Sequence, residues 1–199
     1  MSNAHAPLHV VAFAGSLRRN SYNRWLLDTA AYCAPPGIIM TMFDTMADIP
    51  LFDEDLEAET AGGPEGVKRL RHAVAAADAL LIATPEYNQS LPGVLKNTLD
   101  WLSRDDVEHG EVVSCMPTAI IGATAGRWGT RLAQAQLRHA LAAMGALTMP
   151  APQVYVADAA RCCDRATGRF DVATQEKLHA FLLGFQAWIQ LLQGERDRR

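Results

Sequence analysis

The chain has 199 residues, of which 49% are apolar and 20% charged, with a formal net charge of −4. This composition is that of a globular domain with a full core, and it excludes extensive intrinsic disorder. The mild acidity argues against a nucleic-acid partner, because such a surface needs clustered Lys and Arg to displace counterions from phosphates.

No apolar run reaches the length of a membrane span, and no basic segment leads into an apolar run at the N-terminus. We therefore expect a cytoplasmic protein without a membrane partner. The four cysteines lack Cys-x-x-Cys spacing, and the six histidines lack the spacing of a metal motif. Reduced thiols and no metal site are expected. We interpret residues 1–7 as a tag or disordered tail, residues 8–193 as one domain, and residues 194–199 as a charged C-terminal tail.

Apolar runs and helical periodicity alternate along the chain. Leu8 to Ala14 is apolar without alternation, which is typical of a strand covered on both faces. A helix with apolar residues at three- and four-residue spacing follows, and the same alternation continues to the end. The expected strands are residues 8–14, 38–43, 79–84, 118–123 and 147–156, and the expected helices are residues 23–34, 64–77, 92–103, 130–144 and 174–193. The acidic residues 44–63 predict a long loop with room for one helical turn.

This element order predicts an α/β three-layer sandwich, in which helices cover both faces of a parallel sheet. Five strands favour a flavodoxin-like strand order over the six-stranded dinucleotide fold. Ligands of such sheets bind beyond the carboxyl ends of the strands, where the strand order reverses. The loops after the first, third and fourth strands are therefore the expected site.

The first of these loops, residues 15–23, has the composition of an anion site. It joins a strand to a helix N-terminus, where backbone N–H groups and the helix dipole attract negative charge. Hydroxyl and amide groups add donors, and arginines add positive charge; these residues are Ser16, Arg18 or Arg19, Ser21 and Asn23. The loop is neither Gly-x-Gly-x-x-Gly nor a Gly-Lys-[Ser/Thr] phosphate loop, so a phosphate monoester is favoured. Simple capping of the helix by Asn20 or Ser21 is the alternative explanation.

The second loop carries a longer motif. The pattern Pro-Glu-Tyr-Asn-x-Ser-x-Pro-Gly-x-Leu-Lys-Asn-x-x-Asp-Trp runs from Pro85 to Trp101. Together with Gly-Ser-x-Arg-x-x-Ser-x-Asn at residues 15–23, it resembles the NAD(P)H-dependent FMN reductase family of flavodoxin-like proteins. That family includes quinone, azo-dye and chromate reductases. The resemblance covers most of residues 8–192.

The resemblance implies bound FMN and NADPH or NADH as cosubstrate. It implies that Ser16, Arg18, Ser21 and Asn23 hold the FMN phosphate. It implies that Pro85, Glu86, Tyr87 and Asn88 lie along the isoalloxazine ring and ribityl chain. The following helix is expected to act as scaffold or subunit contact through Lys96, Asn97, Asp100 and Trp101. A plain core position is an equally good explanation of Trp101. No side chain is expected to be catalytic, because flavin N5 carries the chemistry.

The third loop departs from the family, which often has a Gly-Gly pair at this point. Here Arg127 and Trp128 separate Gly126 from Gly129. We include Thr124, Gly126, Arg127 and Trp128 in the expected cofactor site. Trp128 covers the flavin or the nicotinamide, or it packs in a subunit interface, and the sequence does not choose between these roles.

The expected function is hydride transfer from NAD(P)H to bound FMN, followed by reduction of a small acceptor such as a quinone, with ping-pong kinetics. Arg18, Arg19 and Arg127 favour NADPH through its 2′-phosphate. The apolar faces of helices 92–103 and 130–144 predict a homodimer or homotetramer. Two alternatives stay open: a flavodoxin-type electron carrier served by protein partners, and a binding protein that has lost redox activity.

Overall fold

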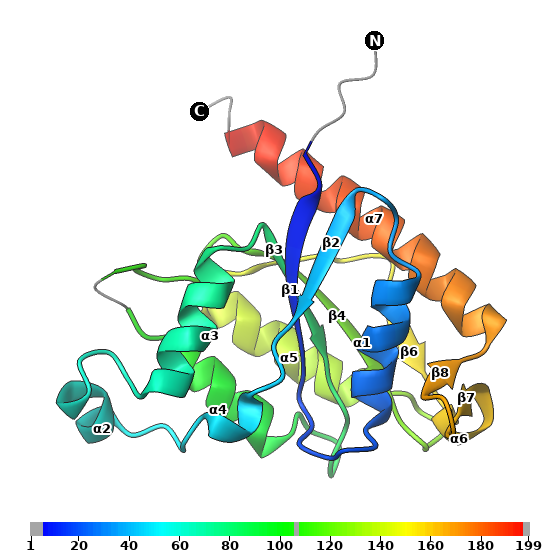
Figure 1. The fold of residues 1–199 in the computed structure, drawn as a ribbon, viewed down its shortest axis with the longest axis horizontal. Helices are drawn as coiled ribbons and strands as arrows, with labels where there is room; N and C mark the ends of the chain where they lie inside the picture. The colour runs from blue at the N-terminus through cyan, green and yellow to red at the C-terminus, as the bar shows by residue number, and fades with distance from the viewer. Residues whose placement is uncertain (1–5, 106–107, 197–199) are drawn as a thin grey trace.

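The computed structural model describes residues 6–105 and 108–196. Parallel strands form one central sheet, with the strands β1 (Leu8–Ala14), β2 (Ile38–Met42), β3 (Ala79–Ala83) and β4 (Pro117–Ala123) in the order β2-β1-β3-β4. The fifth position beside β4 is shared by β5 (Leu147–Thr148) and β6 (Val154–Val156). This is the expected flavodoxin-like order, and the three-layer prediction is confirmed (Figure 1).

The fifth strand differs from the single strand expected over residues 147–156. Both β5 and β6 pair with β4, but the segment between them contains Pro150 and Pro152. Proline has no backbone N–H to donate to a ladder, so the pairing is interrupted there.

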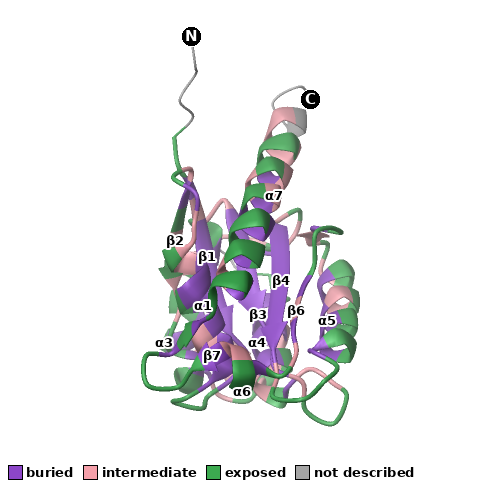
Figure 2. Cartoon of the chain, turned by 90° about the vertical axis from the view of Figure 1, so that its right-hand side faces the viewer, coloured by how far each residue is buried: buried purple, intermediate pink, exposed green. Residues whose placement is uncertain are grey.

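Helices cover both faces of the sheet. On one face lie α1 (Tyr22–Tyr32) and the long α7 (Val172–Arg196), and on the other lie α3 (Glu65–Ala75), α4 (Gly93–Leu102) and α5 (Arg131–Ala143). Side chains of β1 alternate between the two cores: Val10 and Ala12 face α1, whereas Val11 and Phe13 face α3 and α4. Figure 2 shows the buried residues concentrated in the strands and on the inner sides of the helices.

The expected loop over residues 44–63 contains more structure than one turn. A short 3₁₀ helix, η1 (Met46–Asp48), is followed by α2 (Glu54–Glu59). The Asp53 carboxylate caps α2 by accepting a hydrogen bond from the Asp55 N–H at 2.9 Å. Helical periodicity is weak here because α2 has no buried residue.

A buried arginine ties this segment to the domain. Arg71 on α3 is fully buried, and its guanidinium donates to the carbonyl oxygens of Gly62 and Trp101. The carboxylate of Glu57 on α2 lies 3.6 Å from the same guanidinium. A buried cation that is paired and hydrogen-bonded fixes the elements around it, so α2 is held against α3 and α4.

Between β6 and α7 lies a unit that the sequence did not predict. It consists of α6 (Ala159–Cys162) and the hairpin of β7 (Cys163–Asp164) and β8 (Arg169–Phe170). The hairpin packs on α1, where Gly168 approaches the Trp25 ring so closely that an added Cβ would lie 2.8 Å from it. Cys33, Cys162 and Cys163 are free thiols, and burial raises the pKa of Cys163 to about 11.

Candidate functional site

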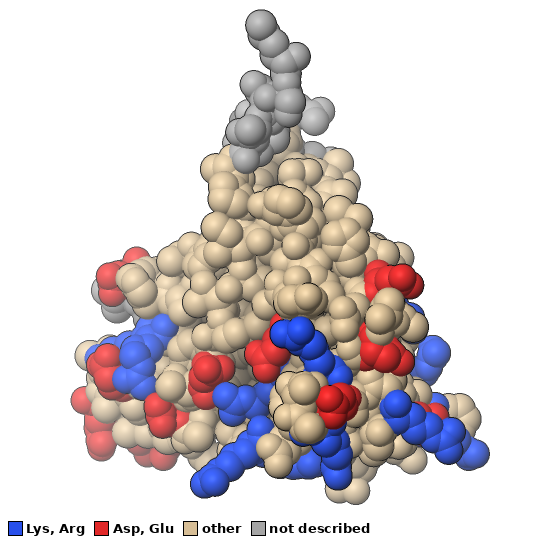
Figure 3. Space-filling model, turned by 45° about the vertical axis from the view of Figure 1, so that its right-hand side comes forward, with Lys and Arg blue, Asp and Glu red and all other residues tan. Residues whose placement is uncertain are grey.

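The loops after β1, β3 and β4 meet at one end of the sheet, the lower end in Figure 1. The first loop begins as an extension of the sheet, since the Gly15 N–H donates to the Ala83 carbonyl of β3 at 2.8 Å. Figure 3 shows Lys and Arg side chains gathered at the lower end of the visible face, with Asp and Glu among them. Arg18, Arg19 and Arg127 are all exposed in these loops.

Two buried hydroxyls line the first loop. Ser21 caps α1, because its Oγ accepts a hydrogen bond from the Asn23 N–H at 3.2 Å. The Oγ of Ser16 accepts from the Arg18 N–H at 3.4 Å. Each hydroxyl acts as an acceptor in these contacts, so its own proton remains able to donate. Two hydroxyl donors at a helix N-terminus fit a phosphate monoester. The capping role explains Ser21 without a ligand, but it does not explain why the Ser16 hydroxyl is buried as well.

The side chain of Asn23 contacts the end of β4. Its side chain is buried, and its carboxamide pairs with the backbone of Ala123 at the end of β4, donating to the carbonyl and accepting from the N–H, both at 2.9 Å. The structure therefore uses the Asn23 side chain to join the first loop to the third. Asn23 therefore positions the first and third loops relative to each other.

The second loop turns sharply at its tip. Tyr87 and Ser90 exchange two backbone hydrogen bonds, of 3.1 and 3.0 Å. Asn88 and Gln89 between them have φ of 51° and 62°. Positive φ at both central residues is the mark of a type I′ turn, which favours Asn and Gly. The turn leaves Tyr87 and Asn88 exposed at the rim, while Pro85 is buried behind them.

Glu86 anchors this loop to α5. Its Oε2 accepts hydrogen bonds from the backbone N–H groups of Leu132 at 2.9 Å and Ala133 at 3.0 Å. Thr130 precedes α5 but makes no side-chain capping bond, so Glu86 supplies the cap from another loop. Gln136 adds a second link, with its Nε2 donating to the Gln89 carbonyl at 3.1 Å.

The helix behind the second loop acts as scaffold. Asn97 on α4 accepts from the Phe52 N–H at 2.7 Å and donates to the Pro50 carbonyl at 2.8 Å. The indole of Trp101 donates to the same carbonyl at 2.9 Å and is fully buried. Trp101 is therefore a core residue, which is one of the two roles expected for it, and its fully buried side chain does not supply a subunit contact. Lys96 and Asp100 form an ion pair on the outer side of α4.

The surface over Gly126 in the third loop is open. Among the described residues, a Cβ added to Gly126 would meet the Thr124 Oγ1 alone, at 3.8 Å, so none of them requires glycine there. Gly129, in contrast, has φ of +68° and faces the Tyr155 side chain. Trp128 is 67% exposed, and the Arg127 guanidinium carbon lies 5.0 Å from its ring centroid. The open surface over Gly126, flanked by an exposed aromatic ring, suits a planar ligand.

One further arginine reaches the first loop from a part of the chain that sequence reasoning passed over. The guanidinium carbon of Arg165, in the β7–β8 turn, lies 5.8 Å from the ring centroid of Tyr22, which begins α1. Asp164 shapes this turn by accepting bonds from the Ala166 N–H and the Thr167 hydroxyl, both at 2.9 Å. The sequence Asp-Arg-Ala-Thr-Gly at residues 164–168 contains turn-forming Asp and Gly, and it was the feature that could have revealed this hairpin.

Within residues 6–105 and 108–196, no group of three or more His, Cys, Asp and Glu side chains is arranged to hold a metal ion. Nor does that part of the chain contain a helix with the length and hydropathy to cross a membrane.

Comparisons with known proteins identify the family of this chain. The model of the NADPH-dependent FMN reductase family matches residues 8–161. The chain is 40% identical to an NAD(P)H-dependent FMN reductase of Pseudomonas aeruginosa, with 94% of this chain and 98% of that protein covered. It is 36% identical to a 2-hydroxy-1,4-benzoquinone reductase of a Burkholderia species, with 96% and 98% covered.

A solved structure is similar over the same extent. The flavoenzyme NAD(P)H:(acceptor) oxidoreductase FerB of Paracoccus denitrificans superposes with a TM-score of 0.81 and 33% identity, over 92% of this chain and 97% of that one. The family expected from the two loop motifs is thereby confirmed. This chain belongs to the NADPH-dependent FMN reductase family.

Proposed function

We propose that this protein binds FMN at the three loops and uses it to pass reducing equivalents from NAD(P)H to a small acceptor such as a quinone, in ping-pong order. The observation that carries the proposal is the joining of the loops into one rim. Asn23 fastens the first loop to the end of β4, and Glu86 fastens the second loop to α5. A preorganised rim lowers the ordering cost of binding a cofactor.

Each part of the rim has a role in this proposal. Ser16, Ser21 and the α1 N-terminus hold the phosphate, and Arg18 supplies positive charge from the exposed side. Pro85, Glu86, Tyr87 and Asn88 border the ring on one side, and Thr124, Gly126, Arg127 and Trp128 on the other. When bound, flavin supplies the redox chemistry by accepting a hydride at N5 and giving electrons to an acceptor. The protein positions the ring and leaves one face open.

A quinone is the acceptor class that fits best. Relatives that share more than a third of their residues with this chain include a 2-hydroxy-1,4-benzoquinone reductase. Trp128 and Tyr87 are exposed aromatic side chains at the rim, 67% and 45% respectively, and aromatic faces stack on planar rings. The same open face would receive the nicotinamide and then the acceptor, and this sharing is the reason for expecting ping-pong kinetics.

We also propose a cytoplasmic homodimer or homotetramer. The inner faces of α4 and α5 are covered by the chain's own sheet, so they do not supply a subunit contact. Leu132 on α5 is 48% exposed, and it is the better candidate for a subunit contact. Sedimentation at micromolar concentration tests this assembly, and a strict monomer would contradict it.

The function is tested by mixing the purified protein anaerobically with FMN and NADPH and following the visible absorbance of the flavin. Bleaching followed by return of the colour on adding a quinone is the expected result. Parallel lines in double-reciprocal plots at varied quinone would establish the ping-pong order. If the flavin stays oxidised with both NADPH and NADH, the protein is a carrier or binding protein and the proposal fails.

A further inference from the structure

The unit formed by α6, β7 and β8 borders the proposed flavin site. Figure 1 shows it beside the end of α1 that the first loop joins. Two backbone hydrogen bonds connect the start of the unit to the third loop. The Asp158 N–H donates to the Gly126 carbonyl at 3.1 Å, and the Ala159 N–H donates to the Thr124 carbonyl at 3.0 Å. The unit therefore lies against both α1 and the third loop.

Aromatic contacts fix the β7–β8 hairpin on the first turn of α1. Gly168 of the hairpin packs on the Trp25 ring, and this ring meets the Tyr22 ring edge to face, with centroids 5.7 Å apart. Tyr22 begins α1 directly after the capping residue Ser21, and its side chain is buried. The guanidinium carbon of Arg165 lies 5.8 Å from the centroid of the Tyr22 ring. Its positive charge is thus placed at the helix turn where the phosphate is proposed to bind.

The charge of Arg165 is not offset by an ion pair. Among the described residues, no carboxylate lies within ion-pair distance of its guanidinium. Asp164 is its neighbour in the chain, but the two carboxylate oxygens of Asp164 accept hydrogen bonds from the Ala166 N–H and the Thr167 hydroxyl, both at 2.9 Å. Asp164 is therefore used within the turn, and the Arg165 guanidinium is left for another anion.

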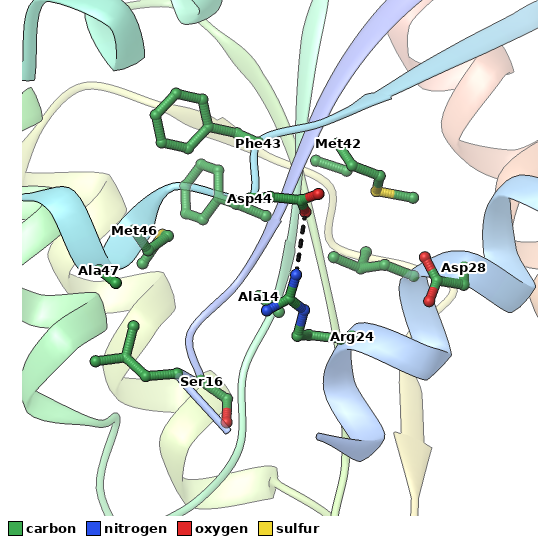
Figure 4. Close-up of a pocket in the computed structure, with 13 residues that line it drawn as sticks. Ala14, Ser16, Arg24, Asp28, Met42, Phe43, Asp44, Met46 and Ala47 are labelled. Carbon is green, nitrogen blue, oxygen red and sulfur yellow. Dashed lines mark ion pairs between the residues drawn. The ribbon is translucent and has the colours of Figure 1, made fainter. Parts of the chain in front are cut away.

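Other arginines along α1 already have a favourable electrostatic environment. Arg24 pairs with Asp44 at 3.5 Å, as the dashed line in Figure 4 marks. Arg169 of the hairpin lies 4.4 Å from the ring centroid of Tyr32, the last residue of α1. A cation at that end is favoured by the helix dipole, whereas a cation at the N-terminal end is disfavoured. Arg165 is at the N-terminal end, so an anion bound there would turn its position into a favourable one.

We propose that Arg165 is a further phosphate-binding residue of the FMN site, which adds positive charge from the hairpin to that of Arg18. Contacts of an exposed guanidinium with a ring are weak, so Arg165 can move from Tyr22 toward a phosphate without losing a strong interaction. Its effect depends on Ser21 and Arg18, because they hold the phosphate within its reach. The proposal rests on the function proposed above, since it takes FMN as the ligand of these loops.

The test compares FMN with riboflavin, which lacks the phosphate, by titration of flavin fluorescence at low ionic strength. Arg165→Ala should weaken FMN by about threefold to tenfold, as expected for a solvent-screened attraction to a phosphate dianion, and should leave riboflavin unchanged. Arg165→Lys keeps the charge and should lose less. In about 1 M salt the Debye length falls to about 3 Å, so wild type and Arg165→Ala should bind FMN with nearly equal affinity.

The matched control is Arg169→Ala. Arg169 is an exposed arginine of the same hairpin that also lies over a tyrosine ring, but at the other end of α1. Its replacement should leave the affinities for FMN and riboflavin unchanged. A second control is the Arg18→Ala/Ser21→Ala background, in which Arg165→Ala should have no further effect on FMN, because the phosphate is no longer held beside the hairpin.

Three results would overturn the proposal: an Arg165→Ala variant that binds FMN as tightly as the wild type at low ionic strength, a variant that loses FMN and riboflavin affinity equally, or an equal loss of FMN affinity in Arg169→Ala. The first result, in a protein that prefers FMN to riboflavin, would remove only the role of Arg165. A wild-type protein that binds no FMN would instead remove the proposed function itself.

Discussion

The carboxamide of Asn23 makes two hydrogen bonds of 2.9 Å to the backbone of Ala123, a residue 100 positions away in the chain. This contact joins the N-terminal turn of α1 to the end of β4. It therefore sets the distance between the loop proposed to hold the FMN phosphate and the loop proposed to border the ring.

Replacing Asn23 should disturb both stability and cofactor binding. Asn23→Ala leaves the buried N–H and carbonyl of Ala123 without their partner, which is expected to cost about 2 to 4 kcal/mol of unfolding free energy. FMN should also bind more weakly, because the two loops are no longer held together. Chemical denaturation and FMN titration measure the two effects. Asn20→Ala, at an exposed position of the same loop, should change stability by less than about 0.5 kcal/mol.

Glu86 is expected to act through α5. Glu86→Ala removes the cap that the carboxylate gives to Leu132 and Ala133, at a cost of about 1 kcal/mol. Glu86→Gln keeps an acceptor oxygen, so it should lower the stability by less than Glu86→Ala does. Thermal unfolding of the two variants against Glu176→Ala, an exposed glutamate on α7, measures the difference. Equal melting temperatures for all three would mean that the contact does not stabilise the helix.

The end of α2 offers a stabilising change. Ala61 follows the helix with φ of 50°, and the Gly62 N–H donates to the Glu57 carbonyl at 3.1 Å, the pattern of a Schellman cap that normally has glycine at this point. Ala61→Gly should raise the unfolding free energy by about 0.5 to 1 kcal/mol. Ala58→Gly, inside the same helix, should lower it by about 1 kcal/mol. Urea denaturation of the pair tests whether the signs are opposite.

Arg71 is the residue on which the packing of α2 depends most. Arg71→Lys keeps the charge but removes the planar guanidinium that reaches Gly62, Trp101 and Glu57. We therefore expect the free energy of unfolding to fall by about 2 to 3 kcal/mol. Arg69 lies on the same helix as Arg71 and forms an exposed ion pair with Asp48 of η1. Arg69→Lys should change the free energy of unfolding by close to zero. Similar losses for both variants, measured by urea denaturation, would contradict the role assigned to the buried guanidinium.

The sequence predicted the main strands and helices because these depend on local periodicity. It predicted the strand order because five parallel strands joined by crossover helices favour one arrangement. It placed the three loops at one end of the sheet because parallel strands end at the same edge. It did not predict that Asn23 and Glu86 bind backbone groups, since those contacts join residues that are 100 and 46 positions apart. The hairpin of β7 and β8 was missed because strands of two residues have no periodicity to detect. The sequence also did not predict the cavity that residues of β1, α1 and the segment after β2 line (Figure 4), because these three elements are separate in the chain.

The phosphate loop is the central element of the proposed FMN site, and Arg18 and Ser21 allow its most direct test. The measurement is the affinity of the wild-type protein and of the double variant Arg18→Ala/Ser21→Ala for FMN and for riboflavin, which lacks the phosphate. The wild type should bind FMN far more tightly than riboflavin, and the double variant should bind the two alike, with an unchanged circular dichroism spectrum. A folded double variant that still prefers FMN as strongly as the wild type would contradict the placement of the phosphate on residues 15–22.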